Sequence, residues 1–146
     1  MMDARVLGRG GEMRWFAKKK PRDIWDEAIQ WPIGDIEAAD RIRSICEAAA
    51  ASAELVASFA ARGSHRKKSV EAQHKRESQR YERAARTAME IALKISDDLM
   101  RDDAVRRIVD LCMKANDMKT AQILNRAIHA AWVREAVSRD YPALGQ

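Results

Sequence analysis

Proline and glycine are scarce in this chain of 146 residues. It has three prolines and six glycines, and between Asp35 and Tyr141 there is no proline and a single glycine, Gly63. The same stretch shows no period-two alternation of apolar and polar residues and no dipeptide typical of a β-hairpin turn. Because it is instead rich in alanine, arginine, glutamate, leucine and methionine, the sequence predicts an all-α protein.

Cysteine and long apolar runs are scarce as well. The two cysteines, Cys46 and Cys112, belong to no Cys-x-x-Cys pair and no Cys/His cluster, which argues against a zinc finger or a disulfide framework. The first residues lack the apolar core of a signal peptide, and no uninterrupted apolar run of about 18 residues occurs. These absences predict reduced cysteines within helices and a cytoplasmic protein that does not enter a membrane.

Motifs of catalysis are also missing. There is no glycine-rich phosphate-binding loop and no nucleophile elbow. Glu71 and His74 form a Glu-x-x-His pair, but a carboxylate metal site needs further carboxylates from a facing helix. The facing side of the preceding helix offers alanines, Ile42, Cys46 and Val56. We therefore predict a non-enzymatic protein without a metal or cofactor.

Two long amphipathic segments, 35–62 and 64–100, carry apolar residues spaced alternately three and four apart. The first seam consists of Ala39, Ile42, Cys46, Ala49, Ala53, Val56 and Ala60. The second consists of Val70, His74, Glu77, Tyr81, Ala84, Ala88, Ile91 and Ile95. With Asp35 and Ser64 as N-caps and Gly63 at the turn, the segments predict one long antiparallel helical hairpin.

Shorter helices are expected on both sides of this hairpin. Asp23 is the predicted cap of a helix over 24–30, which ends before Pro32. Asp102 or Asp103 is the predicted cap of a helix over 104–115, and a helix over 120–137 completes a C-terminal hairpin. We expect about five helices in a single domain, 23–141, with a flexible basic arm (1–22) before it and a tail (142–146) after it.

The net charge of +5 is distributed unevenly along the chain. Residues 1–22 hold seven Lys/Arg and two acids, residues 23–64 three and eight, residues 65–86 eight and three, and the remainder nine of each. On an ideal helix of about 100° per residue, six cations fall within roughly 140° of arc, away from the seam. This cationic ridge comprises Lys68, Lys75, Arg76, Arg80, Arg83 and Arg86.

Such a ridge suits nucleic acid or an acidic partner surface. A solvated helix face explains it as well, because Glu71–Lys75 and Glu82–Arg86 have the spacing of favourable i,i+4 pairs. No sequence motif of a known nucleic-acid-binding fold accompanies the ridge, so any such binding would involve the phosphate backbone with weak sequence preference.

The N-terminal arm and the segment after it combine aromatic and basic residues. The candidate binding cations are Lys18, Lys19, Lys20 and Arg22, and the candidate docking aromatics are Trp15, Phe16, Trp25 and Trp31. Aromatics among cations can stack on bases or anchor in the groove of a protein. For Trp25 and Trp31 we favour a strap folded over the chain's own helices, and we expect residues 1–20 to be free or partner-bound.

Two functions follow from these features. The first is a small helical interaction or accessory protein that binds a protein partner or self-associates. A seam made largely of alanine buries little area, which favours a homodimer or an obligate partner. The second is a non-specific nucleic-acid-binding module that uses the cationic ridge. The clustered tryptophans favour the first, because nucleic-acid binding needs only the charges.

Overall fold

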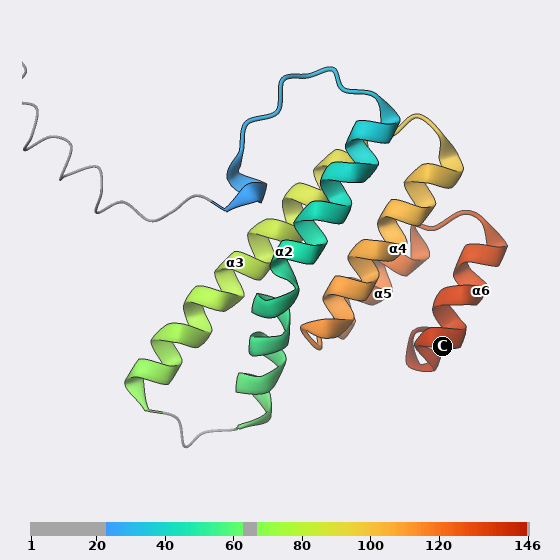
Figure 1. Cartoon of the computed structure of the whole chain (residues 1–146). Helices are drawn as coiled ribbons and strands as arrows, with labels where there is room; N and C mark the ends of the chain where they lie inside the picture. The colour runs from blue at the N-terminus through green and yellow to red at the C-terminus, as the bar shows by residue number, and fades with distance from the viewer. Residues whose placement is uncertain (1–22, 63–66, 146) are drawn as a thin grey trace, which may run out of the picture.

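The predicted all-α fold is confirmed. The computed structural model describes residues 23–62 and 67–145, and this part of the chain contains five α-helices and no strand (Figure 1). In chain order the elements are η1 (Ile24–Asp26), α2 (Asp35–Ala61), α3 (Lys68–Ala92), α4 (Asp98–Lys114), α5 (Met118–Arg126), α6 (Ala131–Asp140) and η2 (Pro142–Gly145). The predicted turn residues Gly63 and Ser64 lie outside the described residues.

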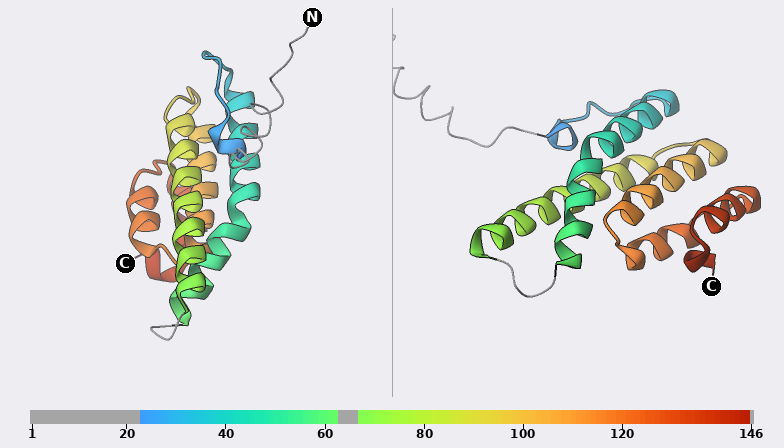
Figure 2. Two further views of the ribbon diagram at one scale, coloured as in Figure 1. Left: turned by 90° about the vertical axis from the view of Figure 1, so that its left-hand side faces the viewer. Right: turned by 60° about the horizontal axis from the view of Figure 1, so that its bottom comes forward.

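The helices α2 and α3 form the predicted antiparallel hairpin, and α4 packs against both of them (Figures 1 and 2). The centre of the core lies among these three helices, where Ile42, Ala49, Ala84, Ala88 and Ile108 are fully buried. In turn α5 and α6 pack against α4, and η1 lies against α2 and α3. Since α4 covers the alanine-rich hairpin, the thin seam no longer requires a second copy to bury it.

The seam of α3 is buried largely as predicted, but the seam of α2 is displaced. The predicted Ala60 is exposed, and Phe59 is buried instead. Ala38 and Ile45 are likewise buried in place of Ala39 and Cys46, which are half-buried. The physical reason is that α2 contacts two helices rather than one, so its buried stripe follows both partners.

The connection between α3 and α4 differs from the prediction. The carboxylate of Asp35 does not cap α2, whose N-cap is Gly34. It accepts hydrogen bonds from the backbone N–H groups of Ser96 (2.9 Å) and Asp97 (3.0 Å). The helix α3 therefore ends at Ala92 rather than near residue 100, and Asp97 rather than Asp102 or Asp103 caps α4 by accepting from the Met100 N–H at 2.8 Å.

The single helix predicted over 120–137 is broken into α5 and α6. Asp102, a buried residue of α4, accepts hydrogen bonds from the backbone N–H groups of His129 (3.2 Å) and Ala130 (2.8 Å) at the start of α6. Its carboxylate thereby satisfies amides that the helix itself leaves unpaired.

Two further boundaries also change at the ends of the domain. The helix predicted over 24–30 is the short η1. The expected tail contains η2, whose Leu144 is buried against the core, so the folded part extends beyond residue 141.

Among the described helices, α2 is long and apolar enough by length and composition to cross a membrane. Charged residues interrupt its exposed side, namely Asp40, Arg43, Glu47 and Glu54. Its buried side belongs to the core formed with α3 and α4. Of the most apolar 18-residue window of α2, 28% is buried in the structure, so burial against these two helices accounts for only part of its apolar composition.

Candidate functional site

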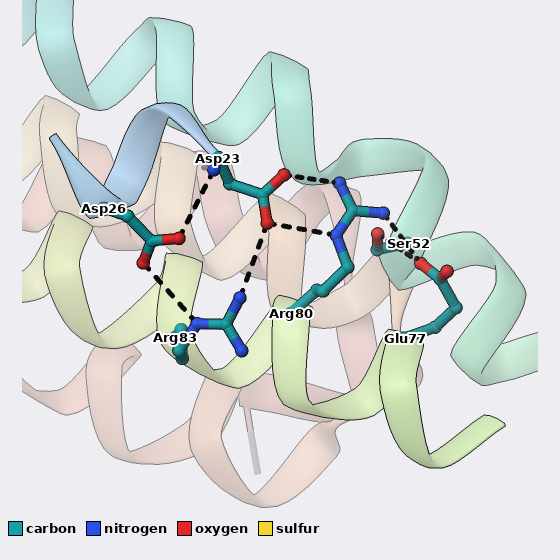
Figure 3. Close-up of polar contacts among 6 residues, drawn as sticks. All are labelled: Asp23, Asp26, Ser52, Glu77, Arg80 and Arg83. Carbon is teal, nitrogen blue, oxygen red and sulfur yellow. Dashed lines mark hydrogen bonds and ion pairs between the residues drawn. The ribbon is translucent and has the colours of Figure 1, made fainter. Parts of the chain in front are cut away.

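The cationic ridge of α3 is divided into two parts by its contacts with the N-terminal strap, which we define as residues 23–33 (Figure 3). Arg80 binds the carboxylate of Asp23 in a two-point arrangement, with Nη2–Oδ1 at 2.8 Å and Nε–Oδ2 at 3.2 Å. Arg83 donates to the same carboxylate at 3.4 Å, and its Nε lies 3.6 Å from Asp26 Oδ1. Two of the six ridge cations are therefore neutralised within the chain.

The same contacts continue into the hairpin. Arg80 Nη1 donates to Glu77 Oε1 at 3.2 Å, and the Ser52 hydroxyl of α2 donates to that oxygen at 2.6 Å. Glu77 thus has partners at a seam position where an apolar residue is usual. Above all, the hydrogen bonds that Arg80 donates to Asp23 raise the pKa of the Arg80 guanidinium. We call the whole set, Asp23, Asp26, Ser52, Glu77, Arg80 and Arg83, the clasp.

The tryptophans of the strap lie in different environments. Trp25 is buried, and the guanidinium carbon of Arg80 lies 5.5 Å from the centre of its ring. It is a core residue and offers no free docking surface. Trp31 is 42% exposed, with Lys94 Nζ 5.1 Å from its ring. The other arm candidates, Trp15, Phe16, Lys18, Lys19, Lys20 and Arg22, lie outside the described residues.

Four ridge cations stay available on the surface of α3: Lys68, Lys75, Arg76 and Arg86. All four are exposed, and no carboxylate among the described residues lies within ion-pair distance of them. In particular, the i,i+4 pair expected between Glu82 and Arg86 is not formed in this part of the chain. The first and last of these cations are separated by about 27 Å along the helix.

A groove that the sequence analysis missed lies between α3 and α5. It has a volume of about 380 Å³ and is mainly apolar. Its apolar lining comprises Tyr81, Ala85, Met89, Leu93, Ile108 and Leu124. Its polar lining comprises Glu82, Arg86, Glu90, Asp117 and Thr120. Ile108, which is fully buried, comes from α4 and separates the two walls.

One signal in the sequence could have indicated this groove. Ala85, Met89 and Leu93 are spaced four residues apart and lie beside the predicted seam of α3, so they form a second apolar row. The side chain of Leu93 is 67% exposed, and that of Ile123 in α5 is 56% exposed. The sequence did not indicate what packs beside this row, because α5 comes near it only once α4 has packed against both α3 and α5.

Titratable groups beside the groove serve the fold. The Tyr81 hydroxyl donates to Asp117 Oδ2 at 2.7 Å, and the other oxygen of Asp117 caps α5 through the Thr120 N–H. Burial raises the pKa of Tyr81, with Cys112 and Asp117 adding to the effect. Burial also raises the pKa of Cys46 to about 12 and that of Cys112 to about 11, so neither thiol is a ready nucleophile near neutral pH.

The histidine that formed a Glu-x-x-His pair in the sequence has a packing contact. The ring of His74 lies edge-on to Phe59, with the ring centres 5.5 Å apart. Within residues 23–62 and 67–145, no three His, Cys, Asp or Glu side chains come together as a metal site would require.

Comparisons with known proteins give no further guidance, since the chain matches no protein-family model, no curated protein and no solved structure.

Proposed function

We propose that this protein is a small, non-enzymatic helical interaction protein of the cytoplasm. Its docking surface is the groove between α3 and α5, and its partner is an amphipathic protein segment with apolar side chains flanked by basic ones. The observation that carries this proposal is the groove itself, which is mainly apolar and open at the surface. Fully burying one leucine or methionine side chain contributes about 1.5–3 kcal/mol, so Met89 and Leu93 offer a useful part of a docking energy.

The charges on the rim define the partner further. Glu82 and Glu90 are exposed, and neither has an ion-pair partner among the described residues. They flank Arg86, one helical turn away on each side. Two carboxylates around an apolar groove favour a partner whose apolar residues are accompanied by lysine or arginine, because complementary charges set orientation and specificity.

A photo-crosslinking amino acid at position 93 tests this proposal in cells that produce the protein. We expect a covalent adduct with a protein whose attached peptide contains apolar and basic residues. The matched control places the same amino acid at Ser58, an exposed position of α2 away from the groove. The double change Glu82→Lys with Glu90→Lys should remove the adduct while leaving the fold intact. Equal adducts from positions 93 and 58, or no adduct with another protein from position 93, would refute the groove as the docking surface for a partner.

Nucleic-acid binding is the second candidate, favoured by the four exposed cations Lys68, Lys75, Arg76 and Arg86. The appropriate variant is Lys75→Glu with Arg76→Glu, because reversing Arg80 or Arg83 would break the clasp. If all four cations contact phosphates, affinity for a fluorescent duplex should fall with salt at a log–log slope of about −3.6. The double variant should lose about half of that slope, whereas Lys119→Glu on α5 should leave it unchanged. A slope near zero for the unaltered protein would eliminate this candidate.

A further inference from the structure

We propose that the groove between α3 and α5 is filled, in the protein without a partner, by the chain's own N-terminal segment, with Trp15 and Phe16 placed against Met89 and Leu93. This inference rests on the proposed function, since it takes the groove to be a docking surface and names its resident occupant. A foreign partner then has to displace this segment in order to bind.

The clasp holds the residue at which the N-terminal segment joins the folded domain. Asp23 is held by Arg80 and Arg83, which belong to the same helix that forms one wall of the groove. Met89 lies six residues beyond Arg83, about 9 Å along the axis, and a path halfway around a helix about 10 Å wide adds about 16 Å, so the path over the surface of α3 is about 18 Å long. The seven residues from Phe16 to Asp23 span up to about 23 Å when extended. The segment is therefore long enough to reach the groove within one molecule.

The charges of the segment complement the groove rim. Residues 1–22 hold seven basic and two acidic residues, and the rest of the chain holds twenty of each, so the whole net charge of +5 lies in this segment. Lys18, Lys19 and Lys20 follow the aromatic pair directly. With Trp15 and Phe16 in the groove, these lysines lie within reach of the exposed carboxylates of Glu82 and Glu90. Both carboxylates lack a described partner.

The apolar parts match as well. The groove is lined by Ala85, Met89 and Leu93 from α3 and by Leu124 from α5. Methionine adapts to the shape of an aromatic ring, and sulfur–aromatic contacts are favourable. Tryptophan and phenylalanine each bury about 150–250 Å² and are the side chains that most often anchor a docked segment.

Methyl NMR of the full chain labelled at its methionines tests this inference. Ring currents should shift the Met89 methyl signal in the unaltered protein, and Trp15→Ala with Phe16→Ala should abolish that shift. Trp31→Ala, which removes an exposed tryptophan outside the groove, is the control and should leave the Met89 signal in place. The Met100 and Met113 signals report on the core, against which both side chains pack, and should not move in either variant.

Charge changes test the same contact in two directions. Glu82→Lys with Glu90→Lys should release the segment and reproduce the Trp15→Ala, Phe16→Ala spectrum, whereas Arg86→Glu should strengthen the ring-current shift. A Met89 signal that is identical with and without Trp15 and Phe16 would overturn the proposal. So would a shift that disappears on dilution, because the segment would then come from a second copy.

The two proposals fail separately. If position 93 gives partner adducts while the Met89 signal ignores the aromatic pair, self-docking is wrong and the groove binds only foreign segments. If neither experiment gives a positive result, the groove is not a docking surface and both proposals are wrong.

Discussion

Replacing Asp102 should lower the free energy of unfolding far more than replacing an exposed residue of α4. Its side chain is 1% exposed, and its carboxylate accepts from the backbone N–H groups of His129 and Ala130. Asp102→Ala leaves two amides without a partner at the junction of α5 and α6. Each unsatisfied buried group costs about 1–3 kcal/mol, so two cost about 2–6 kcal/mol. Because both hydrogen bonds are only partly buried, we expect a loss in the lower part of this range, about 2–4 kcal/mol. Asp102→Asn keeps one acceptor oxygen, and we expect it to cost less, about 1 kcal/mol.

Urea unfolding followed by circular dichroism measures these losses. The neighbouring Asp103 provides a matched control, because its carboxylate forms an exposed ion pair with Arg107 at 3.4 Å. Asp103→Ala should change the free energy of unfolding by less than about 0.5 kcal/mol. An Asp102→Ala variant as stable as Asp103→Ala would refute the conclusion that this carboxylate holds the start of α6. Faster hydrogen exchange at residues 129 and 130 in Asp102→Ala would locate the effect.

Three further predictions concern the strap, the thiols and the assembly. Trp25→Ala should lower the free energy of unfolding by about 3–5 kcal/mol, whereas Trp31→Ala should lower it by less than about 1 kcal/mol, because only the Trp25 side chain is buried. Similar melting temperatures for the two variants would contradict the structure. Burial raises the pKa of Cys46 from 9.0 to about 12, so the folded state favours the neutral thiol. That contribution to stability is present below pH 9 and lost as the pH rises toward 12; we expect Cys46→Ala to show a smaller alkaline loss in unfolding experiments, and an unchanged loss would argue against it. Light scattering should give a monomer of 16.5 kDa because α4 covers the hairpin seam, and a stable dimer at micromolar concentration would restore the argument for self-association.

The strap shows how far the charge pattern of a sequence predicts its ion pairs. Residues 23–64 carry an excess of acid and residues 65–86 an excess of base, and Asp23 of the first stretch pairs with Arg80 and Arg83 of the second. The helical wheel nevertheless grouped these two arginines with the four that stay exposed. A wheel places side chains around one axis and contains no information about a strap that returns to the same helix.

The sequence by itself determined the helical class and the α2–α3 hairpin, because the absence of helix breakers and the three-four spacing of apolar residues are local properties of the chain. It did not determine where the C-terminal helices end. Asp102 and Ala130 are 28 residues apart, and their hydrogen bond exists only once α4 and α6 are packed together. The groove has the same origin. Met89 and Leu124 become walls of one surface because α4 packs between α3 and α5, and the direction in which α4 packs depends on contacts that no local spacing contains.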